Sequence, residues 1–598
     1  MTHFKTTLTI LSLVAASLTG CSSQPDSRNQ SHVRGTFLNE ACQPLVNANI
    51  PSTSLKGIRL VGTSITNAPF ASSAAEIVSY DACSDRLYVV NAQDKKIDVL
   101  ALSRDSIPTS VGQIDLQSAG KHNGIEIGAA NSVSTHNGLI AVAIENKKKQ
   151  RNGIIALYRS DSLDIINTFP AGALPDMVSF SKDGRYIAAA NEGEPNSNYS
   201  IDPEGSITLI DLKPGLEHAI VTQIDFKDFN QGESRYSELG EDVRISGPNA
   251  SVAQDLEPEY LTFADNGKLY VAMQENNAIA TIDVQSASIE KIFGLGGKSW
   301  ETSQLDASNK DGIIGNLHAY PMLEGLYMPD SIASYTIKGK TYIVTANEGD
   351  GREYGFDATQ KQCDDDGHKW DGDDDQDASD YNTKQAFCIA YVDEVRGKDL
   401  KVASSHPLAT ALKDKNRLAR LKIIKPQEVL AADAKVQTFG ARSFSIWSEF
   451  GEPVFDSGDD FARIVLAQDK ANFNSTNDSN QSADNRSDDK GVEPEAIEVA
   501  VIGERAYAFI GLERQGGIMV YDVTIPTHAK FINYLNNRDF IQPVCSEVDD
   551  GDCKSGRYNP KAGDLGPESI EYFSRNGSHY IAVSNEVSGT TSVYSLTF

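Results

Sequence analysis

Residues 494–517, PEAIEVAVIGERAYAFIGLERQGG, contain the pattern from which the fold is predicted. Two apolar segments with alternating polar positions flank a Gly-Glu turn, which is typical of an antiparallel strand pair. Glu495 stands at the start of the first segment, and Glu513 directly follows the second. The pattern recurs at residues 175–193, 258–276, 329–349 and 567–589, and weaker copies begin at Glu76 and Asn131. Such a repeat predicts a modular, β-rich fold.

Each clear copy is followed by further strand-like segments. After residues 175–193 these segments are Ser206–Asp211 and residues 219–225. Four antiparallel strands in a unit of roughly 40 or more residues are typical of a β-propeller blade. The sequence therefore predicts an all-β fold, a seven-bladed β-propeller. The predicted blades begin at Glu76, Asn131, Asp176, Glu259, Asp330, Glu495 and Glu568.

The predicted propeller occupies residues 56–598, and an N-terminal strand closes it. The last blade shows three strand-like segments, and the isolated segment Gly57–Ile65 can supply the fourth. Closure in this way removes an exposed sheet edge. The alternative, two smaller β domains, leaves Gly57–Ile65 without a partner.

Two segments interrupt the repeats. The insertion at residues 349–435, in blade five, is predicted to be largely irregular or helical, with a helix around residues 407–421. The third and fourth strands of blade five are expected near residues 436–455. Residues 472–490 are rich in Asn, Ser and Asp, and this composition predicts a mobile polar loop.

The N-terminus has the pattern of a secretory signal peptide. Lys5 precedes an apolar run at residues 8–18, and Leu-Thr-Gly-Cys ends at Cys21. This tetrapeptide resembles the bacterial lipobox, which implies a lipoprotein signal peptide at residues 1–20, lipidation of Cys21 and a tether at residues 21–55. An ordinary signal peptide is the alternative. We expect a lipid-anchored, extracytoplasmic protein of the cell envelope, on the outer membrane if the source is Gram-negative.

Charge and cysteine content restrict the partners and the compartment. The net charge of −29 argues against nucleic acid and against an anionic membrane surface, so the lipid anchor is the only membrane contact that we expect. The ligand or surface partner is not specified by the sequence, and we expect a monomer. Six cysteines besides Cys21 suit an oxidising compartment. The candidate disulfide pairs are Cys363 with Cys388, Cys545 with Cys553, and Cys42 with Cys83.

Acidic residues recur at both ends of the repeated strand pair. Because the strands are antiparallel, the residue that opens the first and the residue that closes the second should lie at one end of each blade. Twelve of these fourteen positions are acidic, and Asn131 and Gln93 are the exceptions. We name the twelve the carboxylate ring: Glu76, Glu145, Asp176, Glu192, Glu259, Glu275, Asp330, Glu348, Glu495, Glu513, Glu568 and Glu586.

A ring of this density is expected to recruit cations, because like charges repel strongly at short range. Oxygen ligands favour Ca²⁺ or another hard divalent metal. Arg352 and Arg514, each near a ring glutamate, are candidates for phosphate binding. The alternative is a structural role, in which the acids bond backbone N–H groups of their neighbours. The predicted metal ligands in the ring are Glu192, Glu259, Glu275, Asp330, Glu348, Glu495, Glu513, Glu568 and Glu586.

The segment between Cys363 and Cys388 is a second acidic feature. Its aspartates resemble those of calcium loops, although the spacing is not that of an EF-hand. A solvated acidic loop held by a disulfide is the alternative. The predicted ligands are Asp364, Asp366, Asp373 and Asp375. The sequence lacks the G-x-S-x-G and HExxH motifs, so a serine hydrolase or a zinc hydrolase is not supported.

Several longer phrases are similar to a known family. They are DLEPEYLTFADNGKLYVAMQENNAIATID (255–283), FGARSFSIW (439–447), EPEAIE with AYAFIGLERQGGIMVYDV (493–523), and DLGPESIEYF with VSNEVSGTTSVY (564–594). The chain resembles the choice-of-anchor I family, which includes relatives of the mesenchyme-specific cell-surface glycoprotein. The resemblance implies an extracytoplasmic β-propeller with a variable anchor. Some bacterial relatives are labelled alkaline phosphatase-like, but no catalytic residue carries over.

Three functional hypotheses follow. The first is a lipid-anchored propeller whose acidic face binds Ca²⁺ and serves as a binding surface. The second is a metal-dependent phosphoesterase of alkaline phosphatase or phytase type, in which metal-bound water attacks the phosphate. The third is a structural scaffold without a small-molecule site.

Overall fold

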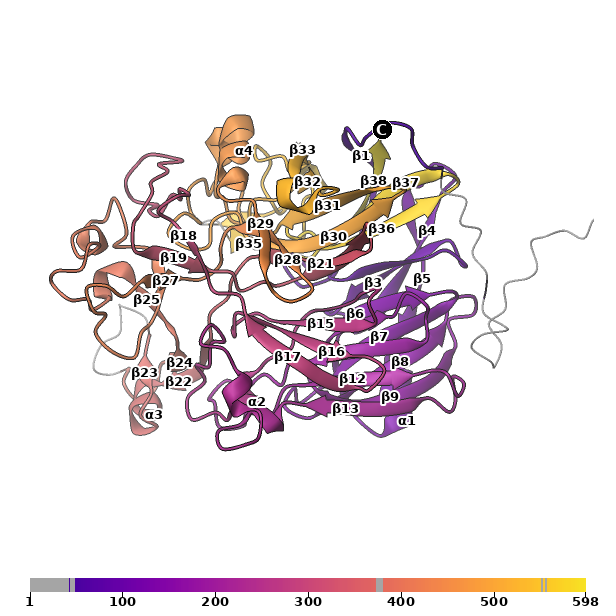
Figure 1. Ribbon diagram of the computed structural model, residues 1–598, viewed down its shortest axis with the longest axis horizontal. Helices are drawn as coiled ribbons and strands as arrows, with labels where there is room; N and C mark the ends of the chain where they lie inside the picture. Colours follow the sequence, from indigo (N-terminus) through magenta and orange to yellow (C-terminus); the bar gives the residue numbers. More distant parts are fainter. Residues whose placement is uncertain (1–41, 43–48, 373–379, 550–551, 554–555) are drawn as a thin grey trace, which may run out of the picture.

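Seven four-stranded antiparallel sheets make up most of the computed structural model (Figure 1). The structure describes residues 42, 49–372, 380–549, 552–553 and 556–598. Strands dominate and helices are few, so the all-β prediction is confirmed. We number the sheets 1 to 7 along the chain.

Sheets 1 to 4 each use four consecutive strands, as the repeat predicts. Sheet 1 contains β2 (Val78–Asp81), β3 (Arg86–Asn91), β4 (Lys96–Leu102) and β5 (Pro108–Asp115). Sheet 2 contains β6 (Ile127–His136), β7 (Leu139–Asn146), β8 (Asn152–Arg159) and β9 (Ile165–Ala173). Sheet 3 contains β10 (Pro175–Phe180), β11 (Tyr186–Asn191), β12 (Ser206–Asp211) and β13 (Ile220–Asp225). Sheet 4 contains β14 (Leu261–Phe263), β15 (Lys268–Met273), β16 (Ala278–Asp283) and β17 (Ser288–Gly294).

Sheets 5 to 7 have the same strand order, with two departures in chain connectivity. Sheet 5 contains β20 (Ile332–Ile337), β21 (Lys340–Asn347), β28 (Ser443–Ser448) and β29 (Pro453–Asp456). Sheet 6 contains β30 (Pro494–Ile502), β31 (Arg505–Leu512), β32 (Ile518–Asp522) and β33 (Lys530–Leu535). Sheet 7 contains β36 (Pro567–Arg575), β37 (Ser578–Asn585), β38 (Thr590–Thr597) and β1 (Gly57–Ile65).

The sheets are joined in cyclic order by contacts between their first strands. Each first strand contacts the first strand of the next sheet, from β2 through β6, β10, β14, β20, β30 and β36 and back to β2. Buried apolar side chains fill the spaces between neighbouring sheets, as in the cluster that joins Phe509 of sheet 6 to Ile581 of sheet 7. The first strands therefore surround a common axis.

Sheet 7 closes the cycle with strands from both ends of the described chain. β1 pairs antiparallel with β38, and Gly57 lies opposite Thr597. The two strands lie side by side near the C-terminus in Figure 1. This pairing confirms that Gly57–Ile65 supplies the missing fourth strand.

The insertion contains more strand than the sequence analysis predicts. β22 (Glu353–Thr359), β24 (Gln385–Val392) and β23 (Lys369–Trp370) form one small sheet, and β25 (Glu394–Arg396) pairs with β26 (Lys422–Ile424). Its described residues form one α-helix, α3 (Gln360–Asp365), and the helix expected at residues 407–421 is only a 3₁₀ turn at Ala411–Lys413. Most described residues of the insertion nevertheless lie outside helices and strands, as a largely irregular segment is expected to be, so the prediction fails at the helix of residues 407–421 and at these short strand pairs.

Other elements flank sheets 4 to 7. β18 (Gly297–Ser299), β19 (Leu323–Leu326) and β27 (Val436–Thr438) form a three-stranded sheet, so residues 436–438 belong to this sheet and not to sheet 5. A helix, α4 (Asp460–Asp469), follows sheet 5. Short elements elsewhere are α1 (Gln117–Asn123), α2 (Val252–Asp255), β34 (Val548–Asp549) and β35 (Asp552–Cys553). Single 3₁₀ turns lie at Lys227–Phe229, Tyr236–Glu238, Gly397–Asp399, Lys470–Asn472, Pro526–His528 and Pro560–Ala562.

The polar segment at residues 472–490 is packed, which contradicts the prediction of a mobile loop. Asn474, Ser475 and Asn477 are buried. Asn480 donates to the backbone oxygens of Asp539 and Gln542. Side-chain hydrogen bonds replace apolar contacts in holding this segment, so its composition does not reveal its order.

Candidate metal centre

A β-bulge places the opening acid in three copies of the repeat. Pro494 lies opposite Leu512, and the register shifts before Ile497, so Glu495 stands outside the regular ladder. The same shift occurs after Pro175 and after Pro567, at Asp176 and Glu568. A bulge re-aims a side chain away from the normal strand alternation. Glu495 and Glu513 thus lie at the same end of their strand pair, as the sequence pattern predicts.

Several ring acids, among them Asp176 and Glu568, line one cavity of about 330 Å³ at the shared end of the first strands, which we name the acidic cavity. It contains no histidine or cysteine among the described residues that line it. The polar residues that line it are Glu76, Asn131, Lys149, Asp176, Glu192, Glu259, Gln274, Asp330 and Glu568.

Asp330, which lines the cavity, forms a triad with Glu348 and Glu495, and carboxylate oxygens of the three lie within 4.8 Å of one another. Gln274 Nε2 donates to one oxygen of Glu348 at 2.9 Å, and Lys490 Nζ contacts the other at 2.5 Å. Glu495 Oε2 is buried and has no hydrogen-bond partner within the described part of the chain. This oxygen distinguishes the triad from a structural cluster in which every buried polar atom has a hydrogen-bond partner.

Burial and mutual repulsion raise the pKa values of the acids in and around the cavity. Burial, with smaller contributions from Asp176, Glu586 and Glu145, raises the pKa of Glu76 to about 8. Burial likewise raises the pKa of Asp176 to about 6, although Lys149 opposes the shift. The other ring acids whose pKa rises through burial are Glu192, Glu259, Asp330, Glu348, Glu495, Glu513, Glu568 and Glu586. Added positive charge would therefore be favourable here.

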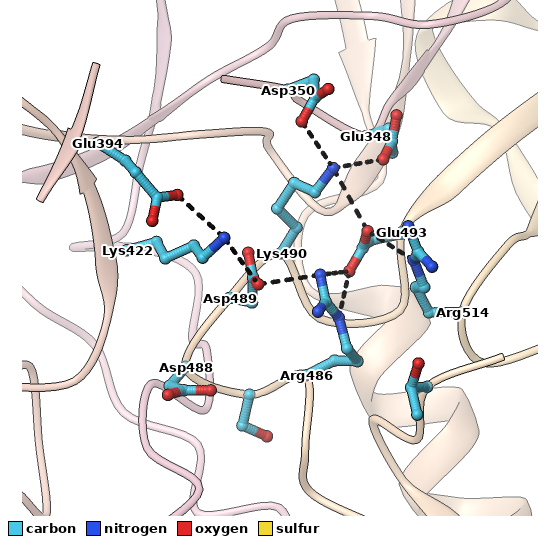
Figure 2. Close-up of polar contacts among 12 residues, drawn as sticks. Glu348, Asp350, Glu394, Lys422, Arg486, Asp488, Asp489, Lys490, Glu493 and Arg514 are labelled. Atoms are coloured by element: carbon cyan, nitrogen blue, oxygen red, sulfur yellow. Dashed lines mark hydrogen bonds and ion pairs between the residues drawn. The ribbon is translucent and has the colours of Figure 1, made fainter. Parts of the chain in front are cut away.

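A second triad, Glu348, Glu493 and Glu513, has carboxylate oxygens within the same 4.8 Å limit. Figure 2 shows Lys490, Arg486 and Arg514 directed at Glu493. Despite its burial, these three cations lower the pKa of Glu493 to about 2. Glu493 is fully buried. The sequence analysis missed it, and the only signal was an acid directly before the Pro-Glu pair.

The two candidate arginines have different surroundings. Arg352 is buried, its guanidinium donates four hydrogen bonds to Ser246, Asp255 and Glu257, and it forms ion pairs with both acids. Arg514 bonds Glu513 at 3.0 Å and Asn477 at 2.9 Å, and about a third of its side chain is exposed. Arg514 lines a cavity of about 370 Å³. The other charged residues that line this cavity are Lys422, Arg486, Lys490, Asp350, Glu353, Glu394 and Asp489.

Not every ring acid faces the acidic cavity. Glu145 accepts a hydrogen bond from the backbone N–H of Ala129 at 2.8 Å, which is the structural role named as the alternative. Glu275 is buried against Glu259. Of the aspartates in the acidic loop, Asp364 and Asp366 are exposed at α3 and its C-cap. Asp373 and Asp375 lie outside the described residues.

All three predicted disulfides are present. They join Cys42 to Cys83, Cys363 to Cys388 and Cys545 to Cys553. The first ties the segment before β1 to sheet 1, and the second holds α3 against β24. Disulfides of this kind are typical of proteins outside the cytosol. Cys21 and the predicted signal peptide lie outside the described residues.

Comparisons with known proteins bear on the family. Gigasin-3a of Magallana gigas is 37% identical over 92 residues, which are 14% of this chain and 32% of that protein. The match thus spans about a third of that relative. Hydrazine synthase of Kuenenia stuttgartiensis superimposes with a TM-score of 0.41 at 10% identity, over 89% of this chain and 96% of that one. The Cps50 (Swd1) β-propeller domain of Myceliophteria thermophila gives a TM-score of 0.38 at 8% identity, over 90% and 100%.

The family model and the helices of the structure give two further findings. Searching the described residues for a membrane-crossing helix finds none of sufficient length and apolarity. The model of the choice-of-anchor I domain matches residues 76–526, which include most of sheets 1 to 6 and the whole insertion. This chain therefore belongs to the choice-of-anchor I domain family, as the sequence resemblance predicts.

Proposed function

We propose that this protein is an extracytoplasmic, seven-bladed β-propeller that acts as a surface binding module and holds Ca²⁺ in its acidic cavity. The seven sheets are its blades, and sheet 7 closes the ring. Family membership and the three disulfides support a location outside the cytosol. Lipidation of Cys21 would supply the anchor.

The observation that carries the calcium proposal is the triad of Asp330, Glu348 and Glu495, of which Asp330 lines the acidic cavity. Asp330, Glu348 and Glu495 bring their oxygens within 4.8 Å, and an oxygen of Glu495 is buried without a partner in the described structure. Leaving a buried carboxylate unpaired is costly, so a cation at this point stabilises the fold. A donor set made only of oxygens suits Ca²⁺ or Mg²⁺ better than Zn²⁺.

Calorimetry and thermal unfolding of the purified chain test this proposal. We expect Ca²⁺ to bind and to raise the melting temperature, and EDTA to reverse the rise. Asp330→Asn and Glu495→Gln should weaken binding. Glu324→Gln, which changes a buried acid paired with Lys435 outside the cavity, is the matched control and should bind normally. Unchanged Ca²⁺ binding in both Asp330→Asn and Glu495→Gln would contradict the proposed triad. If the wild type binds no Ca²⁺ at all, the calcium proposal is excluded and the scaffold hypothesis remains.

A metal-dependent phosphoesterase is the second candidate, favoured by one feature. The cavity that contains Lys422, Arg486, Lys490 and Arg514 adjoins the acid triad through the contact of Lys490 with Glu348. Guanidinium groups bind phosphate oxygens well. We would assay p-nitrophenyl phosphate and phytate with Ca²⁺ and with EDTA, in the wild type and in Arg514→Gln. No turnover with any metal would exclude this candidate and leave the binding module unaffected.

A further inference from the structure

A second cavity, of about 430 Å³, lies farther along the first strands than the acidic cavity, and we name it the axial cavity. All seven first strands contribute residues to its wall, so it lies on the axis that they surround. Ile77, Met177 and Tyr260 line both cavities and therefore separate them. Lys182 and Val501, which are exposed, mark the end at which the axial cavity opens to solvent. Its volume suits a small organic molecule.

Hydroxyl groups supply most of the polar lining of the axial cavity. Ser79 Oγ lies 3.1 Å from Thr135 Oγ1, which joins sheet 1 to sheet 2. Thr262 Oγ1 and Ser334 Oγ share a hydrogen bond of 3.2 Å, which joins sheet 4 to sheet 5. These hydroxyls therefore also hold neighbouring first strands together. The hydroxyl residues that line the axial cavity are Ser79, Ser134, Ser179, Thr262, Ser334 and Ser569.

Sheets 6 and 7 each add a carboxylate to this lining. In sheets 1 to 4 the residue three positions after the one that opens the blade carries a hydroxyl, and in sheets 6 and 7 it is Glu498 and Glu571. Their strands, β30 and β36, are neighbouring first strands, so the two acids face the cavity from adjacent sheets. The backbone N–H of Tyr80 occupies one oxygen of Glu571, at 3.3 Å. The repeat is thus broken on one side of the axis only, as an asymmetric ligand would require.

The residues around the axial cavity do not neutralise these two acids. Lys182 is the one basic residue among the described residues that line it, and it pairs with Asp265 at 2.8 Å. Neither Glu498 nor Glu571 forms an ion pair within the described part of the chain. Burial raises the pKa of Glu571 to about 7, and burial together with the charge of Glu571 raises that of Glu498. A positively charged ligand would offset this cost of burial.

The lining favours an organic ammonium group over a metal ion. Calcium takes roughly six to eight oxygen ligands, whereas no third acid lines the axial cavity among the described residues. An ammonium group is satisfied by fewer acceptors, because it donates only three hydrogen bonds. The carboxylates and the hydroxyls can accept these bonds. Ile77 and Met177, both half-buried at the inner end, present apolar surface to a methylene chain.

We propose that the axial cavity binds a small aliphatic ammonium compound, whose positive charge lies against Glu498 and Glu571. The hydroxyl groups complete its hydrogen bonds, and Ile77 and Met177 contact its methylene groups. The net charge of −29 draws such cations towards the molecule. This site rests on the proposed binding function, because it names a ligand class for it, but it does not require Ca²⁺ in the acidic cavity.

Calorimetry with putrescine, a four-carbon diamine, tests the ligand class. We expect the wild type to bind putrescine in saturating Ca²⁺, and to bind butanediol of the same chain length far more weakly, because the diol is uncharged. Equal affinity for the two compounds, or no binding of putrescine at millimolar concentration, would overturn the proposal. Binding of Ca²⁺ is measured separately on the same protein, so the calcium proposal and the axial site can fail independently.

Carboxylate variants test the position of the site. Glu498→Gln and Glu571→Gln should each weaken putrescine binding about ten-fold, since each removes one charge-assisted contact. Glu568→Gln, on the same strand as Glu571 but at the acidic cavity, is the matched control and should bind putrescine normally. All three changes remove repelling charge, and thermal unfolding checks that the fold is retained. Unchanged affinity in the double variant Glu498→Gln with Glu571→Gln, or an equal loss in Glu568→Gln, would overturn the axial site.

Discussion

Glu493 and Glu495 are two residues apart, both carboxyls are desolvated, and their pKa values move in opposite directions. The pKa of Glu493 falls to about 2, because Lys490, Arg486 and Arg514 surround it (Figure 2). The pKa of Glu495 rises well above its usual value, because burial and the neighbouring Glu568, Glu513 and Asp330 oppose its charge. Glu348 belongs to both triads and connects them.

The difference shows what turns an acidic cluster into a candidate metal site. Burial raises the cost of charge in both triads, and the triad of Glu493 is the more deeply buried. In the triad of Glu493 the fold supplies ammonium and guanidinium groups from residues 486–514, so the cluster is a structural ion network. In the triad of Glu495, Lys490 is the one cation of the described chain that pairs with a member, and it contacts Glu348. The remaining negative charge favours an external cation.

Removing Lys490 is expected to have the largest effect. Its ammonium group contacts Glu348 at 2.5 Å and Glu493 at 3.4 Å, and only 11% of the side chain is exposed. Lys490→Met leaves buried carboxylates uncompensated, so we expect a loss of about 3–5 kcal/mol in the free energy of unfolding. Thermal or denaturant unfolding in EDTA measures it. Lys182→Met, at an exposed pair with Asp265, is the control and should cost no more than about 1 kcal/mol.

Glu493→Gln should destabilise the protein by a smaller amount. Each of the three cations keeps another acidic partner, so we expect a loss of about 2 kcal/mol at neutral pH. The pKa of Glu493 is lowered in the fold, so its contribution is present above about pH 4.5 and disappears as the pH falls towards 2. Unfolding measured across this range should show the wild type and the variant converging at low pH. A constant difference would mean that Glu493 does not act through its charge.

Glu495→Gln should change the free energy of unfolding in the opposite direction. Its pKa is raised in the fold, so ionisation destabilises the native state increasingly as the pH rises above about 4.5. In EDTA at pH 8 the variant should therefore be more stable than the wild type, by roughly 1–2 kcal/mol. The gain should vanish near pH 4.5, and Ca²⁺ should stabilise the variant less than the wild type. A less stable variant in EDTA would show that Glu495 has a structural partner.

The repeat predicted much of this arrangement. Period-two alternation and the recurrent Pro-Asp/Glu pair located the strand pairs, and antiparallel pairing then placed Glu495 beside Glu513. The isolated strand-like segment Gly57–Ile65 predicted the strand that closes sheet 7. These features follow from local geometry that each repeat carries in its own sequence.

The cations could not be placed in the same way. Lys490 and Arg486 belong to a segment whose composition predicts mobility, and it is ordered by scattered side-chain hydrogen bonds. Arg352 stands next to ring glutamates in the sequence but pairs with Asp255 and Glu257, nearly a hundred positions earlier in the chain. Such long-range partners depend on the packing of the insertion, which no local pattern encodes. The sequence pattern therefore predicts where the acids lie, but it does not predict which cations neutralise them.

The smallest effect is expected in the disulfide-bounded acidic loop. Asp364 is exposed at α3 and accepts a hydrogen bond from Tyr381 at 3.1 Å, so water already solvates its charge. Surface charges interact weakly, and Asp364→Asn should change Ca²⁺ affinity by no more than about two-fold in calorimetry. Glu495→Gln in the same experiment is the positive control. A larger loss of affinity in Asp364→Asn would show that clustered acids bind Ca²⁺ even where they are exposed. The difference in neutralisation between the two buried triads would then no longer explain calcium binding.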